Sequence, residues 1–252
     1  MRLIRVHVDA ALAEGARVTL GGSAAAHVRR VLRLAPGAAL TLFNGDGQDY
    51  PSRIVGLGRG TVEAAVEGRA AARAESPLQV TLVQGVARAE RMDLVVQKAT
   101  ELGVAAIVPV ATARSVVRLD RDTRERRLAH WRGIAIAACE QCGRARIPGL
   151  AEPQPLVTRL AAPASGLRIL LAPGADAGLA VAARGAQAVE LLVGPEGGLD
   201  DGEREAALAA GYRACRLGPR VLRSETAAIA AIAVLQAVAG DFGGDAHLHI
   251  RQ

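Results

Sequence analysis

The chain has 252 residues, half of them apolar and 22% charged, a composition that predicts a globular protein and excludes an intrinsically disordered one. It contains no apolar run of the roughly 18 residues that a membrane-spanning helix requires, and its first residues lack the apolar core of a secretory signal. Three cysteines cannot form an even disulfide framework, so we expect a cytoplasmic protein.

The net charge of +6 comes almost wholly from arginine, since Lys98 is the only lysine. A guanidinium group is planar and grips phosphate through paired hydrogen bonds, so this charge would suit an RNA partner. An arginine-rich and alanine-rich genome explains the same composition equally well, because net charge speaks to non-specific binding rather than to a site. Charge alone favours an anionic partner without identifying one.

The first 72 residues have the pattern of short strands separated by turns. Alternating apolar positions predict strands at 39–43, 48–55 and 61–66, joined by glycine-containing turns. A small β-barrel or sandwich domain is therefore predicted over residues 1–72.

A helical insert at about 27–34 interrupts these strands and carries His27, Arg29, Arg30 and Arg33. Residues 1–72 hold nine arginines against six acidic residues, so half of the net charge lies in the smaller part of the chain. We expect this domain to bind nucleic acid.

Beyond a linker at 73–76, strands and helices alternate through a second domain predicted at 77–245. This alternation predicts an α/β fold with a parallel sheet, whose ligands bind beyond the carboxyl ends of the strands. Asp200, with Glu203 three positions later, has the form of a capping box. The predicted strands are 78–86, 105–110, 167–172, 189–193 and 212–217, and the predicted helices are 89–102, 123–142, 201–210 and 224–239.

Two glycine-containing loops of the second domain lie one strand apart. The first is the Gly-Pro-Glu-Gly-Gly turn at 194–198, and the second, at 217–226, opens an almost wholly apolar helix. Glycine lets the backbone approach a ligand closely, and Arg220, Arg223 and Glu225 are too many charges for an idle turn beside an apolar helix. We predict that the two loops are walls of one ligand pocket.

Common nucleotide-binding loops do not fit these residues. A P-loop needs Gly-Lys followed by Ser or Thr, whereas Lys98 lies in the middle of a predicted helix. A dinucleotide fingerprint needs Gly-x-Gly-x-x-Gly, whereas Pro195 and Glu196 lie inside the first turn, and the carboxylate of Glu196 would repel a pyrophosphate. Backbone carbonyls and a carboxylate suit a ligand of cationic or amine character, such as S-adenosyl-L-methionine.

The two loops resemble motifs of a known family. Leu192–Leu199 and Leu217–Ala228 look like the two cofactor motifs of the SPOUT methyltransferases. With Arg91–Asp93, Gln97–Val104 and Glu140–Arg144, the match is to the RsmE family, which methylates N3 of a uridine in 16S ribosomal RNA of the small subunit. The resemblance covers most of the chain in the family's order.

The resemblance implies features that the spacing of residues does not show. The family folds its C-terminal part into a deep trefoil knot, works as a homodimer and carries a PUA-like β-barrel for RNA at its N-terminus. A helix from Ala227 to Val238 that is apolar on nearly all sides is compatible with cover by a knot, by a partner chain, or by both. Two alternatives stay open: a methyltransferase of the same fold with another RNA target, and a non-catalytic RNA-binding assembly factor.

Methyl transfer from a sulfonium is a one-step in-line displacement, so the site must hold the donor and the acceptor aligned about 3 Å apart. N3 of a neutral uridine carries a proton, so the site must favour its loss and stabilise the negative charge that spreads over O2 and O4. Arg223 is the first candidate for that electrostatic role and Arg144 the second. Glu225 is a candidate proton acceptor, directly or through water.

The expected contacts also have structural alternatives. Glycines can merely turn a tight corner, Glu196 can cap the turn that follows it, and Ser224, Glu225 and Thr226 are favoured residues at a helix N-terminus. The expected cofactor contacts are Leu171, Ala172, Gly194, Pro195, Glu196, Gly197, Leu217, Gly218, Leu222, Arg223, Ser224 and Thr226. The expected RNA contacts are Arg5, His27, Arg29, Arg30, Arg33, Arg144 and Arg146.

Cys139 and Cys142 form a C-x-x-C pair on a predicted helix. A zinc site needs four ligands, which this chain supplies thinly, so no metal is expected. Lys98 is expected to form an ion pair with Glu101 or a backbone contact.

Overall fold

The computed structural model describes residues 4–73, 75–115, 121–163 and 166–243, which divide into two compact units. The first unit combines the residues up to Glu75 with Ile136–Ile147, and the second comprises Ser76–Ala135 and the residues from Pro148 onward. The last two positions of the predicted second domain, 244 and 245, lie outside the described residues. Of the helices in the described part of the chain, none is long and apolar enough to cross a membrane.

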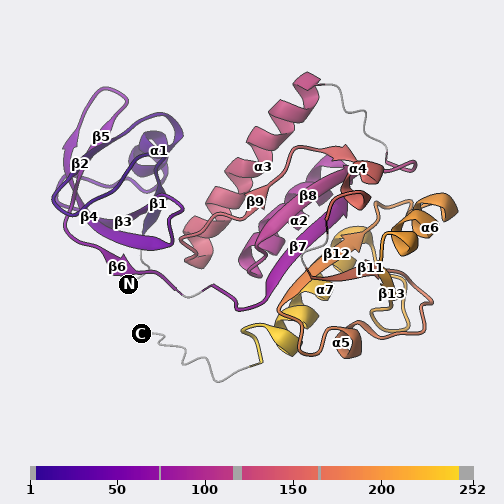
Figure 1. The fold of residues 1–252 in the computed structure, drawn as a ribbon. Coiled ribbons are helices and arrows are strands. Elements are labelled where there is room, and N and C mark those ends of the chain that lie inside the picture. The colour runs from indigo at the N-terminus through magenta and orange to yellow at the C-terminus, as the bar shows by residue number, and fades with distance from the viewer. Residues whose placement is uncertain (1–3, 74, 116–120, 164–165, 244–252) are drawn as a thin grey trace. The chain divides into compact units, whose positions relative to one another are not determined.

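The first unit is built on a curled sheet of six strands (Figure 1). They are β1 (Arg5–His7), β2 (Arg17–Leu20), β3 (Ala39–Phe43), β4 (Gln48–Leu57), β5 (Val62–Val66) and β6 (Ala70–Ala71). Their order is β1-β3-β4-β5-β2, with β6 paired to β4, and only β1 and β3 run parallel. Alternate strand residues point inward and make a core that includes the fully buried Val6, Leu42 and Val62. In this order β1 and β2 are the two edge strands of the sheet. The predicted barrel is thus a half-barrel.

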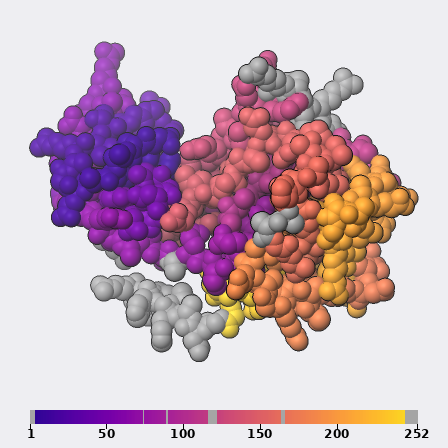
Figure 2. Space-filling view, viewed as in Figure 1, coloured from indigo at the N-terminus to yellow at the C-terminus, as the bar shows by residue number. Residues whose placement is uncertain are grey.

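A helical insert lies between β2 and β3, as the sequence predicts, but it spans 22–31 rather than the predicted 27–34. It consists of α1 (Gly22–Ala26) followed by one π-helical turn, η1 (His27–Val31). Just after it, Arg33 has a φ of 52°, a left-handed conformation that L-residues seldom adopt. Arg29 Nη1 donates to Gly58 O at 2.8 Å, which ties the insert to the turn between β4 and β5. That turn projects from the first unit (Figure 2).

The end of the long helix α3 (Arg121–Cys142) and the residues after it belong to the first unit. The backbone N–H of His7 in β1 donates to Glu140 Oε1 at 3.0 Å, and Arg144 Nη2 donates to Glu75 Oε2 at 2.6 Å. Burial raises the pKa of the Glu140 carboxyl above its ordinary value, and the hydrogen bond from His7 opposes that rise only in part. Charged side chains therefore fasten this segment to the sheet.

The second unit contains a parallel sheet of seven strands. They are β7 (Gln79–Gly85), β8 (Ala106–Ala111), β9 (Gly149–Leu150), β10 (Gln154–Pro155), β11 (Leu167–Leu171), β12 (Ala188–Val193) and β13 (Arg213–Cys215). The order is β10-β8-β7-β12-β11-β13, with β9 paired to β8, and all pairs are parallel. Each of the five predicted strands is confirmed to within two residues. The two-residue strands β9 and β10 are too short to leave a periodic signal.

Helices flank this sheet (Figure 1). Besides α3 they are α2 (Ala89–Glu101), α4 (Leu156–Leu160), α5 (Leu179–Ala182), α6 (Asp201–Ala209) and α7 (Ser224–Ala239). The four predicted helices are confirmed, and the apolar helix α7 packs against α2, α5, β7 and β12. The capping box of α6 is present, and Lys98 pairs with Glu101 at 2.8 Å. The trefoil knot that the resemblance implies stays a prediction.

Sheet order decides which loops meet. Strands β7, β12, β11 and β13 are consecutive neighbours and all run in the same direction. Val193 at the end of β12 is in register with Gln84 of β7, and Leu171 at the end of β11 is in register with Cys215 of β13. The segments that follow these strands therefore leave the sheet at one edge, where α/β proteins bind their ligands.

Candidate functional site

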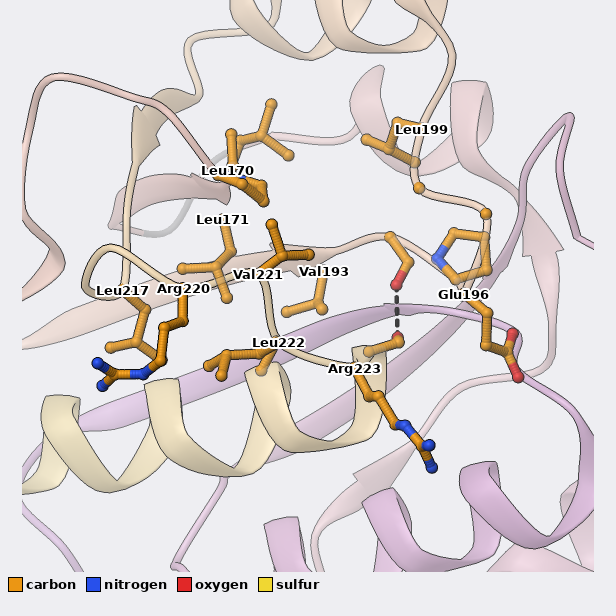
Figure 3. Close-up of a pocket in the computed structure, with 18 of the residues that line it drawn as sticks. Leu170, Leu171, Val193, Glu196, Leu199, Leu217, Arg220, Val221, Leu222 and Arg223 are labelled. Carbon is orange, nitrogen blue, oxygen red and sulfur yellow. Dashed lines mark hydrogen bonds between the residues drawn. The ribbon is translucent and has the colours of Figure 1, made fainter.

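The segments at this edge of the sheet enclose a cavity of about 480 Å³ (Figure 3). Its walls are residues 170–173 at the end of β11, residues 193–199 at the end of β12, and most of residues 217–224 before α7. Ligand sites typically measure about 300–1,000 Å³. The structure thus brings the two glycine-containing loops together around one space of ligand size.

Nearly all of the predicted cofactor contacts line this cavity. The exception is Thr226, whose side chain is exposed on the first turn of α7. Arg91 of α2 and Arg204 of α6 also line it, although neither is among the site residues that the sequence predicts. Arg91 belongs to a segment that resembles the family, so the sequence contained a hint of its place in the site. Arg204 lies among the charged residues of an ordinary surface helix, which gives no such hint.

The turn at 194–198 depends on glycine at two places. Gly198 has a φ of 69°, and its N–H donates to Pro195 O at 2.9 Å, which closes the turn. On the neighbouring strand, a Cβ at Gly85 would lie 2.5 Å from Pro195 N. Gly85 therefore lets the turn lie directly against the end of β7.

Glu196 points out of the turn toward the start of α2. Its Oε1 accepts hydrogen bonds from the N–H of Arg88, the N-cap residue of α2, at 3.1 Å and from Arg91 Nη1 at 3.2 Å. Burial alone would raise the pKa of Glu196, but the N–H groups of Glu196 itself and of Arg88, with the charge of Arg91, outweigh it and hold the pKa below its ordinary value. The carboxylate therefore stays charged and fastens the turn to α2.

Arg91 also faces a second carboxylate. Its Nε lies 3.9 Å from Oε1 of Glu225, which is 8% exposed and does not line the cavity. The other oxygen of Glu225, Oε2, is buried and has no hydrogen-bond partner among the described residues. Arg91 thus lies between the carboxylates of Glu196 and Glu225, of which only Glu196 lines the cavity.

Two arginines of the second loop are exposed at the rim of the cavity. Arg223 is the N-cap residue of α7, and Arg220 lies three positions before it. Figure 3 shows their guanidinium groups pointing in different directions, away from the apolar side chains of Leu171, Val193 and Leu222. The cavity therefore has an apolar interior and a positively charged mouth.

The two loops are joined directly by a hydrogen bond. Ser224 Oγ, at the start of α7, donates to Gly194 O at 2.6 Å (Figure 3). Ser224 is 7% exposed, so water competes little for this bond. The hydroxyl of Ser224 thus fixes one loop against the other, whereas no side chain caps the start of α7, where Arg223 is the N-cap residue.

Of the predicted catalytic residues, Arg144 is held in the first unit. Its guanidinium makes a paired hydrogen bond to Glu75, with its side chain 12% exposed. Arg5, a predicted RNA contact, is also buried: Nη1 pairs with Asp49, Nη2 donates to Arg144 O at 3.0 Å, and the group stacks on Phe43. The structure gives both arginines a role in fastening the first unit together.

The remaining predicted RNA contacts lie at the surface of the first unit. Arg29, Arg30 and Arg33 of the helical insert are exposed, His27 is half-buried, and Arg146 is exposed after α3. The turn formed by η1 and Arg33 presents three guanidinium groups within a few residues.

The two cysteines of the C-x-x-C pair differ in exposure, since Cys139 is buried and Cys142 is half-buried. Cys139 is fully buried, and burial raises its pKa to about 12. Its Sγ lies 3.6 Å from Arg146 O. No group of three metal-binding side chains occurs within the described ranges of the chain.

Family models match both parts of the chain. Residues 74–236 match an RNA methyltransferase domain, and residues 20–67 match an RNA methyltransferase PUA domain. Ribosomal RNA small subunit methyltransferase E from Mycobacterium tuberculosis is 34% identical over 90% of this chain and 88% of its own length. The protein of that name from Buchnera aphidicola is 30% identical over 95% of this chain and 98% of its own length.

Solved structures give the same result. Ribosomal RNA small subunit methyltransferase E from Neisseria gonorrhoeae, bound to S-adenosyl methionine, is 35% identical and superimposes with a TM-score of 0.88 over 96% of this chain and 100% of its own. A methyltransferase from Legionella pneumophila in complex with the same cofactor is 38% identical, with a TM-score of 0.91 over the same shares. With its two glycine-containing loops around one cavity, the chain belongs to the RNA methyltransferase family that includes ribosomal RNA small subunit methyltransferase E.

Proposed function

We propose that the protein uses S-adenosyl-L-methionine to methylate N3 of a specific uridine in 16S ribosomal RNA. The observation that carries this proposal is the cavity between the two loops, in a chain that aligns over nearly its whole length with structures bound to that cofactor. When bound, the cofactor supplies an electrophilic methyl group on a sulfonium. Every other requirement of the reaction falls on the side chains and backbone of the protein.

The residues of the cavity fit such a cofactor. Leu171, Leu217 and Leu222 offer apolar walls for an adenine ring and for the methylene groups next to the sulfonium, and the glycines of the turn at 194–198 bring backbone close to the cavity. The cavity volume is in the range for a ligand of this size. Thr226 faces away from this space, so we do not assign it a contact.

The acceptor nitrogen needs electrostatic help. Loss of the N3 proton places negative charge on O2 and O4 of the uracil, and an adjacent cation stabilises it. Arg223 is an exposed cation of the cavity wall and lies directly before Ser224, which joins the two loops, so we assign it this role. Glu225 lies beside Arg91 and does not line the cavity, which favours a role in orienting Arg91 over one as the proton acceptor. The pairing of Arg144 with Glu75 favours a structural role for that residue.

The first unit is assigned to RNA docking. Arg30 and Arg33 are exposed on an insert whose backbone is fixed by the Arg29 bond to Gly58. Replacing both with alanine should weaken RNA binding and flatten its salt dependence, because each phosphate contact contributes to the slope. Arg53→Ala is the matched control, since Arg53 is exposed but paired with Glu67. An unchanged slope in the double variant would show that RNA binds another face.

A modification map tests the function itself. The protein is incubated with cofactor carrying a labelled methyl group and with either free 16S ribosomal RNA or small subunits, both lacking the modification. Digestion to nucleosides followed by mass spectrometry separates 3-methyluridine from uridine methylated at other atoms. Label in 3-methyluridine supports the proposal, label in another nucleoside or RNA supports a different target, and binding without transfer supports the assembly factor.

The proposal includes a homodimer working in the cytoplasm. One stripe of α7, formed by Ile229, Ala230, Ala233 and Ala237, is only half-buried or exposed in the single chain. An apolar helix with an uncovered stripe is stabilised when a second chain covers it. Light scattering during size exclusion should give twice the mass of the chain, and a monomer at micromolar concentration would contradict this part of the proposal.

A further inference from the structure

Gln84, the next-to-last residue of β7, is a fully buried polar side chain near both loops of the cavity. Its Nε2 donates to Ser224 Oγ at 3.0 Å and lies 3.4 Å from Gly194 O. Ser224 Oγ in turn donates to Gly194 O at 2.6 Å. One buried amide group therefore reaches both loops that form the cavity.

The surroundings set the orientation of this amide. Nε2 also donates to Gly85 O at 3.0 Å, so three oxygen atoms face it. A rotated amide would place Oε1 against the carbonyl oxygens of Gly85 and Gly194, which would repel it. Oε1 itself is buried and has no partner in the described part of the chain, so the NH₂ end supplies the hydrogen bonds of this side chain.

We propose that Gln84 is a positioning residue for the methyl-donor site, which it serves by fixing the separation between Gly194 and Ser224. This inference rests on the proposed cofactor site. Gln84 does not line the cavity, so it acts through Ser224 and Gly194 rather than by touching the cofactor. Loops already held at their binding separation lose less freedom when the cofactor binds, which strengthens affinity.

Gln84→Met tests this role, because methionine keeps the volume of the side chain but removes its amide. We expect affinity for S-adenosyl-L-methionine, measured by calorimetry, to fall about 10-fold, because loops that are no longer held at their binding separation must be ordered when the cofactor binds. An affinity within about twofold of the unaltered protein would overturn the inference.

Gln236→Met is the matched control. Gln236 of α7 is also fully buried, donates from Nε2 to Leu102 O at 2.9 Å and accepts from Ser76 Oγ at 2.6 Å, but it does not contact the two loops. The Gln236→Met variant should lower the melting temperature about as much as Gln84→Met does, while leaving cofactor affinity nearly unchanged. Equal losses of affinity in the two variants would mean that Gln84 contributes only to stability.

Ser224→Ala keeps the inference testable even where Gln84→Met does not fold. It should weaken cofactor binding several-fold by itself, and wild-type affinity in this variant would overturn the proposal. Combined with Gln84→Met, it should add little further loss, because the hydroxyl and the amide act as one unit. If the losses of cofactor affinity in the two single variants multiply in the double variant, the amide and the hydroxyl act independently and the inference is contradicted. Absence of cofactor binding by the unaltered protein is a separate result, which would refute the proposed function.

Discussion

Gly85→Ala tests how closely the glycine turn lies against the end of β7. The new Cβ would be 2.5 Å from both Pro195 N and Pro195 Cδ, whereas ordinary contacts begin at 3.4 Å. The turn must therefore move by about 0.9 Å, and it cannot do so by rotating a side chain, because the nearest atoms belong to backbone and to a proline ring. Overpacking of this kind costs about 1–3 kcal/mol of stability.

The displaced turn should bind the cofactor less well. We expect an increase of about 10-fold or more in the Kd for S-adenosylhomocysteine, and a loss of about 100-fold in methyl transfer, from a shift of this size. Gly149→Ala in β9 is the control, since its Cβ would lie 3.6 Å from Ala106 Cβ, an ordinary contact. Calorimetry and urea unfolding measure both variants. A Gly85→Ala protein with unchanged affinity would refute the argument that β7 supports the turn.

Three further predictions concern other parts of the molecule. Arg223→Ala should lower the single-turnover rate of methyl transfer about 100-fold or more, with a much smaller change in cofactor affinity. The control Arg220→Ala should lower this rate less, and equal rates for the two variants would remove Arg223 from the mechanism. Glu190→Leu should lower the free energy of unfolding in urea by about 3–5 kcal/mol, because it removes the carboxylate that faces Arg168, which is 7% exposed; a loss below about 1 kcal/mol would contradict this. A thiol reagent should modify Cys142 in the native protein well before the two fully buried cysteines, whose pKa values are raised by burial. Mass spectrometry measures the order of modification, and simultaneous modification of all three cysteines would refute this prediction.

Local sequence patterns predicted most of the longer strands and helices of the second unit. Apolar runs such as 189–193 bounded by glycine predict buried parallel strands, and the Asp200–Glu203 pair predicts the start of α6 with its capping box. These signals are reliable because an apolar run is read from residue types alone and helix capping depends on neighbours within a few residues. In the first unit the same reasoning gave β3, β4 and β5, whereas the short strands β1 and β2 carry too few residues to show a period.

Long-range partners were beyond such reasoning. Glu196 looked free to meet a ligand, but it is bound by the start of α2, more than a hundred positions earlier in the chain. Gln84 shares its strand with the polar residues Gln79 and Thr81, and only the neighbouring position of β12 and α7 brings Gly194 O and Ser224 Oγ to its amide. Arg144 belonged to a family motif, yet its partner is Glu75.

By itself the sequence determined the type and approximate bounds of the longer elements, the two loop chemistries and the family to which they point, because these depend on residue type and local spacing. Tertiary structure decided which charges face the cavity and which face each other. The order β7-β12-β11-β13 places loops from distant parts of the chain at one edge of the sheet, and no pattern within a single loop contains that order.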